Sequence, residues 1–335
     1  MLRVAIAGFG KMGRIRAREL LKRADVEIIG VFEQSNLEAD SVVDETLLVE
    51  SFEDLLILQP DAIFICAFNN VACEYTCKAI AAGVHVFCEK PPAMSCEELE
   101  RVRNALETSP VTLKYGFNHR YHYSVLQAKK LIEEGKLGDL LWIRGVYGKA
   151  GSIDYHHNWR NFKKYSGGGI LMDQGIHMLD LFHHLSGKRF DVESALLTNS
   201  FWDVEVEDNA IISLKSDNVI ATMHSSATQW RHKFLVEMCF SHGYLNLDGI
   251  LSESRSYTPE TLTWGLREFE DITFAMGKPA EHCVWFENDD SWKLEIDEFI
   301  TAILSKNDIE NGTFSDAHKV LSLIEDIYQA SGFYN

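Results

Sequence analysis

The sequence predicts an α/β protein in which a parallel, doubly wound sheet is followed by a second α/β part with a large, mostly antiparallel open sheet. Up to Asn118, apolar runs of strand length alternate with helical segments, the pattern of a parallel sheet that helices cover on both faces. Beyond that residue the chain reads mainly as successive strands joined by short polar turns, which is typical of an antiparallel sheet.

The first part is predicted from short apolar runs and the helical segments between them. A helix follows the first run over Lys11–Arg23, and an Ala-rich helix ends near Ala82. Ser51 and Ser95 each precede an acidic residue three positions on, which is how a helix commonly begins. The expected strands are Leu2–Ala7, Val26–Phe32, Asp61–Ala67, His85–Cys88 and Val111–Gly116.

The second part begins with a helix around Val125–Glu134 and an alternating strand over Leu140–Tyr147. A loop rich in His, Tyr, Trp and Gly, residues 149–168, leads into a helix over Ile170–Leu185. Further strands and two closing helices follow from the periodicity of the apolar residues. The strands are Asp191–Thr198, Asn209–Lys215, Val219–Ser225, Phe234–Phe240 and Tyr244–Leu247, and the helices are Trp292–Leu304 and Ser315–Ala330.

Length and charge limit the possible organisation and partners. A chain of 335 residues is too long for one small core, so we expect two domains, residues 1–118 and 119–335. The net charge of −18 disfavours nucleic acid and anionic membranes as partners, because such binding needs clustered Lys and Arg. The chain starts directly on a strand pattern and has no apolar run of roughly 18 residues. We therefore expect a cytoplasmic protein.

The cysteines do not predict a metal site. The chain has seven of them, and Cys73 and Cys77 lie one helical turn apart. No matching second pair occurs in the sequence, so buried thiols are favoured over a metal site.

A glycine-rich turn follows the first strand and opens a helix, which is the context of a dinucleotide site. Gly8 permits the tight turn, Gly10 lets a pyrophosphate approach the backbone, and Gly13 lets helix and strand pack closely. The helix N-terminus offers N–H groups to phosphate. A plain strand–helix turn with incidental glycines is the alternative. The predicted contact residues are Gly8, Phe9, Gly10, Lys11, Met12 and Gly13.

Glu33 ends the second strand, twenty residues after Gly13. An acid at this place accepts hydrogen bonds from the adenosine ribose hydroxyls and would repel a 2′-phosphate. The sequence therefore favours NAD over NADP, although Lys11 or Arg14 could offset the repulsion. A solvated loop acid is the alternative.

Lys90 lies in the segment Glu89–Pro92, which ends a strand at the carboxyl edge of the sheet. Ligands of open α/β sheets bind outside that edge. The two prolines fix the backbone and allow a cis bond. A lysine held there can hydrogen-bond a substrate oxygen and stabilise the charge that develops on it, whereas a surface lysine in a loop is the alternative.

Asp173 and His177 are four residues apart and lie on one face of the predicted helix. A carboxylate beside an imidazole is a common general-base arrangement, and imidazole titrates near neutral pH. The preceding run Gly167–Gly169 would let the backbone pass close to a ligand. Two alternatives remain: a structural pair, and a metal site, for which no third ligand is evident.

These motifs together resemble the Gfo/Idh/MocA oxidoreductases, and the likeness extends over nearly the whole chain. The matching stretches are Gly8–Gly13, Glu89–Pro91, Gly116–Tyr121, Trp159–Arg160 and Gly168–His177. The resemblance implies an N-terminal Rossmann domain and a C-terminal α/β domain whose sheet often forms the oligomer interface, in a homodimer or homotetramer. It also implies that the helix near residues 315–330 packs back on the Rossmann domain.

The resemblance assigns site residues one by one. It makes Lys90, Asp173 and His177 the catalytic candidates. Further cofactor contacts are expected from Glu33, Ala67, Phe68, Asn69, Glu89 and Lys90. The substrate pocket candidates, each of which could equally be structural, are Asn118, Arg120, Tyr147, His156, Trp159 and Arg160. Two departures, Phe68 in place of a common Pro and Ala72 in place of a common His, leave the contacts to the nicotinamide open.

The implied activity is NAD(P)-dependent hydride transfer to or from a hydroxyl or carbonyl carbon of a sugar, polyol or nucleotide sugar. Stretches at residues 116–123, 154–160 and 225–231 are similar to those of members found with bacterial surface-sugar or flagellin-glycan biosynthesis. One alternative is an NAD-assisted step without net redox change, such as glycoside cleavage or epimerisation. Another is a non-catalytic NAD-binding regulator. No metal is expected.

Overall fold

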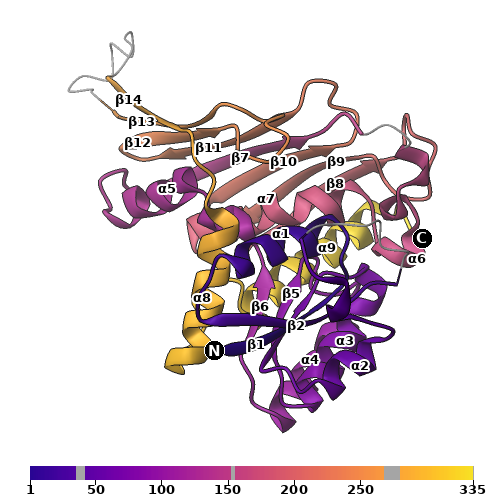
Figure 1. Ribbon diagram of the computed structural model, residues 1–335. Coiled ribbons are helices and arrows are strands. Elements are labelled where there is room, and N and C mark those ends of the chain that lie inside the picture. The colour runs from indigo at the N-terminus through magenta and orange to yellow at the C-terminus, as the bar shows by residue number, and fades with distance from the viewer. Residues whose placement is uncertain (35–41, 152–154, 268–279, 335) are drawn as a thin grey trace, which may run out of the picture. The chain divides into compact units, whose positions relative to one another are not determined.

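The computed structural model describes residues 1–34, 42–151, 155–267 and 280–334, which form two compact units (Figure 1). Each unit takes segments from distant parts of the sequence. The first unit consists of Met1–Asn118, Lys164–Gly167 and Trp292–Ser322. The second unit consists of His119–Lys163, Gly168–Ser291 and the C-terminal residues from Leu323 onward.

The first unit is built on a parallel sheet. Its strands, among the described residues, are ordered β3-β2-β1-β4-β5-β6, and every neighbouring pair is parallel. They are β1 (Leu2–Ala7), β2 (Val26–Phe32), β3 (Leu48–Val49), β4 (Ala62–Ile65), β5 (His85–Glu89) and β6 (Leu113–Gly116). This is the Rossmann strand order, in which ligands bind outside the carboxyl ends of the strands, where the order reverses between β1 and β4.

The helices of this unit complete its core. They are α1 (Lys11–Leu21), α2 (Phe52–Ile57), α3 (Asn69–Ala81), α4 (Cys96–Thr108), α8 (Ser291–Ser305) and the first part of α9 (Phe314–Ser331). Phe299 of α8 contacts the rings of Phe64 and Phe87 edge-on, with centroid separations of 5.5 and 5.6 Å. The strands are nearly continuous apolar runs because helices cover both of their faces, and a helix from the end of the chain supplies part of that cover.

The second unit is built on one large sheet. Its strands, within the described part, are ordered β14-β13-β12-β11-β7-β10-β9-β8. Neighbours are antiparallel except for β7 and β10, which are parallel. The strands are β7 (Leu140–Gly148), β8 (Asp191–Thr198), β9 (Asn209–Ser216), β10 (Val219–Ser226), β11 (Lys233–Phe240), β12 (Gly243–Asp248), β13 (Glu260–Leu266) and β14 (Glu281–Phe286).

Helices cover one face of this sheet. The helices α5 (Tyr123–Glu133) and α7 (Ile176–Ser186) run along it (Figure 1), and α7 continues directly from a π-helical turn, η5 (Leu171–Gly175). The remaining short elements are η1 (Glu45–Leu47), η2 (Asn118–Tyr121), η3 (Tyr155–His157), η4 (Trp159–Asn161) and α6 (Lys163–Ser166). On the strands, buried and exposed positions alternate, as the pleat requires.

The predicted fold class is confirmed. Most predicted strands and helices agree with the structure to within two residues, and Ser51 and Ser95 cap α2 and α4 as expected. The strands β3, β13 and β14 were not predicted. None of the helices in the described ranges combines the length and the apolar character needed to cross a membrane.

Candidate active site

The glycine-rich turn joins β1 to α1 at the carboxyl edge of the first unit's sheet. Gly8 has a φ of +91°, and a Cβ there would lie 2.6 Å from the backbone of Cys66–Ala67. A Cβ at Gly13 would lie 2.1 Å from the Gly8 carbonyl oxygen, so packing requires both glycines. A Cβ at Gly10 would meet no described protein atom within 4 Å. Packing leaves Gly10 unexplained, and close approach of a pyrophosphate to the backbone explains it.

The start of α1 suits a phosphate group. The described first turn of the helix contains no acidic residue, and its N-cap, Gly10, contributes no side-chain cap. The backbone N–H groups of that turn therefore remain suited to an anion. Lys11 is exposed at the first helical position, Met12 is half-buried, and Phe9 is buried beneath the turn.

Glu33 lies against the same turn. Its Oε2 accepts a hydrogen bond from the Phe9 N–H at 2.5 Å, and the Gly8 N–H donates to the Phe32 carbonyl at 2.8 Å. The end of β2 is thereby fixed to the glycine-rich turn. A carboxylate in this place can accept the ribose hydroxyls of an adenosine whose pyrophosphate lies at the helix start.

The segment after β4 reaches the same edge. Ala67 is half-buried, and Phe68 is 37% exposed with its ring 6.0 Å from the ring of Tyr165. Asn69 is buried and its Nδ2 donates to the Ser166 carbonyl at 2.8 Å. The observed partners of Phe68 and Asn69 are thus residues of the first unit, and their contacts to a cofactor stay predictions.

Lys90 directly follows β5, and the Lys90–Pro91 bond is cis. The preceding Glu89 is held by a fully buried arginine: Arg16 Nε donates to Glu89 Oε1 at 2.7 Å, and Arg16 Nη2 donates to Glu295 Oε2 at 2.6 Å. Burial raises the pKa of Glu295 to about 7, although the charges of Arg16 and Lys114 oppose the shift. The chain entering Lys90 is therefore anchored from α1 and α8.

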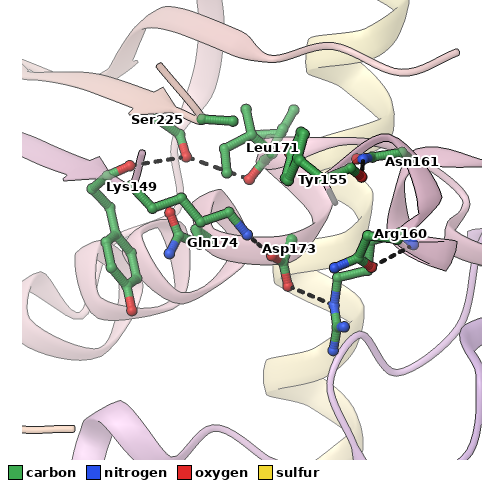
Figure 2. Close-up of polar contacts among 12 residues, drawn as sticks. Lys149, Tyr155, Arg160, Asn161, Leu171, Asp173, Gln174 and Ser225 are labelled. Atoms are coloured by element: carbon green, nitrogen blue, oxygen red, sulfur yellow. Dashed lines mark hydrogen bonds and ion pairs between the residues drawn. The ribbon is translucent and has the colours of Figure 1, made fainter. Parts of the chain in front are cut away.

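In the second unit, Asp173 lies between two cations (Figure 2). Lys149 Nζ, at the end of β7, contacts Asp173 Oδ2 at 2.6 Å, and Arg160 Nε contacts Asp173 Oδ1 at 3.2 Å. The side chains of Lys149 and Asp173 are only 20% and 18% exposed, whereas Arg160 is 38% exposed. Asp173 is on the π-helical turn η5, a feature frequent at functional sites.

The loop that precedes η5 carries three of the pocket candidates. The Arg160 guanidinium lies over the Trp159 ring at 4.4 Å, a cation–π contact that fixes it beside Asp173. His156 is exposed and its ring is 5.7 Å from that of Trp202. Residue 154, at the start of a stretch used for the family resemblance, lies outside the described residues.

His177 is on α7 and is 5% exposed. The ring of His119 stacks on it with a centroid separation of 3.8 Å and an interplanar angle of 15°. His119 Nε2 is in turn 3.0 Å from the hydroxyl of Tyr147, a pocket candidate, whose pKa burial holds well above its usual value. The phenol therefore stays protonated and can donate to His119, and the plane of His177 is fixed by its stacking partner.

A second polar group adjoins Tyr147. Its ring meets that of Tyr257 edge-on at 5.4 Å, and the Tyr257 hydroxyl accepts from Gln174 Nε2 at 2.9 Å. Burial raises the pKa of Tyr257 to about 12, and burial together with the charge of Lys149 lowers the pKa of His232. Gln174, beside Asp173, is thereby held in place by Tyr257, which lies in the segment between β12 and β13.

Arg120 and Asn118 are buried, with exposed fractions of 4% each. Both Arg120 Nε and Nη2 donate to the fully buried Asp180, at 2.8 and 2.6 Å. This ion pair accounts for Arg120 within the second unit. A substrate contact by Arg120 or Asn118 stays a prediction.

The structure gives a packing reason for the glycine run. A Cβ at Gly168 would lie 2.0 Å from the Tyr328 hydroxyl, and a Cβ at Gly169 would lie 2.2 Å from the Glu207 carbonyl oxygen. A Cβ at Gly167, whose φ is +78°, would lie 3.1 Å from the Met94 side chain. Close packing within the protein therefore explains these glycines, and a ligand passing close to this run stays a prediction.

The arrangement can supply acid–base chemistry in the second unit and dinucleotide binding in the first. Sequence reasoning missed Lys149, His119 and Arg16, each of which contacts a predicted site residue from a distant segment. Lys90 belongs to the first unit, and Asp173 and His177 belong to the second. Over the described residues, no cluster of three or more His, Cys, Asp or Glu side chains could hold a metal ion.

Fold and glycine-rich turn together define a two-part protein with a dinucleotide-binding Rossmann unit. The family model described as "Oxidoreductase family, NAD-binding Rossmann fold" matches residues 2–117, and the model of the GFO/IDH/MocA C-terminal domain matches residues 125–246. The chain belongs to the Gfo/Idh/MocA oxidoreductase family, and its N-terminal unit is an NAD-binding Rossmann fold.

Curated relatives are similar over part of their length. D-glucoside 3-dehydrogenase of Escherichia coli (strain K12) is 31% identical over 193 residues, which are 56% of this chain and 54% of the relative. Glucose-6-phosphate 3-dehydrogenase of Bacillus subtilis (strain 168) is 33% identical over 200 residues, 58% of this chain and 56% of the relative. The chain thus matches little more than half the length of these relatives.

Solved structures share the fold over nearly the whole chain. Levoglucosan dehydrogenase, in complex with NADH and levoglucosan, matches with a TM-score of 0.83 at 19% identity, covering 99% of this chain and 97% of that one. Aldose-aldose oxidoreductase from Caulobacter crescentus, complexed with glycerol, matches with a TM-score of 0.81 at 22% identity, with the same coverage.

Proposed function

We propose that this protein is an NAD-dependent oxidoreductase that transfers hydride between the nicotinamide and a hydroxyl or carbonyl carbon of a sugar, polyol or nucleotide sugar. The observation that carries the proposal is the pairing, in one chain, of an NAD-binding Rossmann fold with a second unit that presents Asp173 between two cations and His177 nearby on the same helix. Residues 1–118 would bind the dinucleotide and residues 119–335 the substrate.

In the proposed reaction, three side chains act on one substrate hydroxyl. His177 takes the hydroxyl proton as general base. Lys90 donates a hydrogen bond to the same oxygen and stabilises the charge that develops on it. Asp173 supports the pair electrostatically, and Lys149 and Arg160 hold its carboxylate in one orientation. NAD, when bound, supplies the hydride acceptor at its nicotinamide ring.

The residues of the glycine-rich turn fit NAD. Gly10 leaves the backbone open to a pyrophosphate, and the first turn of α1 supplies N–H groups. The Glu33 carboxylate, held at the turn by the Phe9 N–H, favours ribose hydroxyls over a 2′-phosphate. NAD is therefore the proposed cofactor, with NADP disfavoured.

The proposed substrate class rests on chemistry and on relatives. Trp159 offers an aromatic face and Arg160 a charged edge to a sugar or its acidic group, and Tyr147 and His156 are further candidates. The similar curated proteins are named for dehydrogenation of a glucoside, a sugar phosphate and inositol. A sugar or polyol hydroxyl is thus the substrate group we propose.

A substrate panel tests the function. The full chain is incubated with NAD and with polyols, sugars, sugar acids or nucleotide sugars, and NADH formation is followed by absorbance. Reduction with ketosugars and NADH tests the reverse direction. We expect NADH formation with at least one class, and no turnover in either direction across the panel would contradict the proposal.

A second candidate keeps the cofactor and changes the net reaction. One relative is named 2,7-anhydro-N-acetylneuraminate hydratase and is 28% identical over 189 residues. Product formation without NADH release, with NAD still bound to the isolated protein, would favour such a step. Ligand binding with neither product nor NADH would instead favour an NAD-binding regulator.

We also propose a cytoplasmic homodimer or homotetramer that assembles through the large sheet. The sheet's uncovered positions expose apolar side chains around the Arg144–Glu237 ion pair. These are Trp142 (40% exposed), Leu196 (68%), Ile211 (52%), Ile220 (57%) and Trp285 (65%). An exposed apolar face of this kind supports the proposal of a subunit interface there. Sedimentation should give a dimer or tetramer, and Ile220→Lys should weaken it; a monomer at all concentrations would contradict this.

A further inference from the structure

Glu207 is a buried carboxylate that the proposed reaction does not use. It lies in the segment between β8 and β9 and is 1% exposed. An ionised carboxylate in such a place is costly unless hydrogen bonds compensate it, and burial raises the pKa of Glu207 against the lowering effect of the hydrogen bonds that it accepts. Its acceptor bonds therefore indicate what it does.

Those bonds run to the start of the helix that carries Asp173 and His177. The Gly169 N–H is 3.0 Å from both Glu207 oxygens, and the Leu171 N–H donates to Oε1 at 3.0 Å. The Ile170 N–H donates to the Glu207 backbone carbonyl at 3.1 Å. Three consecutive backbone donors at the beginning of the helical segment thus converge on one residue.

Glu207 therefore acts as a helix cap supplied from elsewhere in the chain. The first N–H groups of a helix lack partners within it, and a negative charge at that end is favourable. Sequence spacing could not reveal this cap because the acid lies 36 residues from Leu171. Gly169 is explained by the same contact, since a Cβ at this position would collide with Glu207.

Two tyrosines from the C-terminal segment hold the carboxylate in turn. The Tyr328 hydroxyl donates to Oε1 at 3.0 Å, and the Tyr334 hydroxyl donates to Oε2 at 2.7 Å. Burial, with the nearby carboxylate, raises the pKa of both phenols, so they remain protonated donors. Lys163, which precedes the glycine run in sequence, also contacts this ring: its Nζ lies 3.6 Å from the centre of the Tyr334 ring.

We propose that Glu207, held by Tyr328 and Tyr334, is a positioning residue that fixes the helix start so that Asp173 and His177 keep their catalytic placement. Asp173 lies two residues beyond Leu171, and its own backbone N–H donates to the Gly169 carbonyl at 3.0 Å. A shift at Gly169–Leu171 is therefore passed directly to Asp173. The inference rests on the proposed function, because it assigns a catalytic purpose to this anchor.

The test uses two variants, the double substitution Tyr328→Phe with Tyr334→Phe and the single substitution Glu207→Gln. Tyr123→Phe is the matched control. Tyr123 also donates its hydroxyl to a carboxylate of the second unit, Asp290, at 2.7 Å, but this bond belongs to α5 and does not involve Gly169–Leu171. Amide hydrogen exchange over residues 169–177, kcat, KM, NAD affinity and Tm are measured for each full-length variant.

We expect the Tyr328/Tyr334 and Glu207 variants to exchange the Gly169–Leu171 amides about tenfold faster and to lose about tenfold in kcat, as loss of a charged hydrogen bond implies. NAD affinity should stay unchanged, and Tyr123→Phe should lower Tm without either effect. Unchanged exchange would overturn the inference, as would faster exchange with wild-type kcat. If the wild-type chain turned over no compound, the proposed function would fail, while exchange would still decide whether Glu207 holds the helix.

Discussion

Lys149→Met tests whether the ion pair between Lys149 and Asp173 matters for turnover. Methionine keeps the apolar stem of lysine and removes the amine that lies 2.6 Å from Asp173 Oδ2. Hydrogen bonds to charged groups contribute about 1.5–3 kcal/mol. The pair is mostly buried, at 20% and 18% exposure, but Arg160 keeps a second contact at 3.2 Å. The lower end of that range applies, about 1.5 kcal/mol, which corresponds to about a tenfold loss in kcat/KM.

The assay is steady-state NADH formation with the substrate found in the panel, with NAD affinity measured separately. Lys293→Met is the control, because Lys293 contacts Asp297 at the same 2.6 Å but the two side chains are 55% and 30% exposed. An exposed pair of this kind contributes about 0.3–0.5 kcal/mol, so the control should leave turnover unchanged. A Lys149→Met enzyme no slower than Lys293→Met would refute the reasoning.

Three further outcomes follow from the first unit. Gly13→Ala should lower the unfolding free energy by about 3 kcal/mol, because the added methyl group overpacks the turn. Gly10→Ala should keep the wild-type Tm and weaken NAD binding about tenfold. If the two variants had equal effects in thermal unfolding and in NAD titration, the separate roles of the two glycines would be contradicted. Glu33→Gln should reduce the preference for NAD over NADP about tenfold in KM ratio, and an unchanged ratio would argue against the ribose contact. Burial lowers the pKa of His85 below 6.5, and its neutral Nδ1 accepts the Thr112 N–H at 2.9 Å. The unfolded chain therefore binds more protons than the folded chain just below pH 6.5, so the free energy of unfolding should fall as pH drops through that range. Denaturant titration at several pH values should show a smaller fall for His85→Gln than for the wild type.

Local sequence patterns were sufficient for most elements of the fold. The apolar runs at Leu2–Ala7 and Val26–Phe32 are strands with the predicted bounds, because helices on both faces demand uninterrupted apolar side chains. The last strands, Glu260–Leu266 and Glu281–Phe286, were missed. They flank residues 268–279, which lie outside the described part, and Glu260, Thr263 and Glu281 break the apolar pattern within them.

Tertiary partners could not be predicted from spacing. Glu89 gave no indication that Arg16 would hold it, or that Arg16 would in turn be bound by Glu295, because these two contacts of Arg16 span 73 and 279 residues. The bond from Lys149 to Asp173 could not be predicted either, because a lysine after a strand is ordinary in sequence. The motifs identify the chemistry of the site, whereas the structure identifies the residues that hold each motif in place.

Arg120 shows what the structure adds to a site residue inferred from sequence. A conspicuous arginine after Asn118 suggests a clamp for a charged substrate, but its guanidinium forms a two-point ion pair with the buried Asp180. The Arg120 side chain is 4% exposed and paired with a buried carboxylate, which gives it a structural contact within the second unit, while its contact to a substrate stays a prediction. Arg120 differs in burial from Arg160, which is 38% exposed. No sequence pattern predicts the burial of a single polar residue.

The central claim is that Lys90 takes part in hydride transfer at a site where NAD binds independently of it. The direct measurement is NADH formation by wild-type protein and by Lys90→Ala with the active panel substrate, alongside the NAD dissociation constant of each. We predict that the variant loses at least about 100-fold in kcat, as for an electrostatic catalytic group, with NAD affinity within about twofold of wild type. Near-normal turnover in Lys90→Ala would contradict the account.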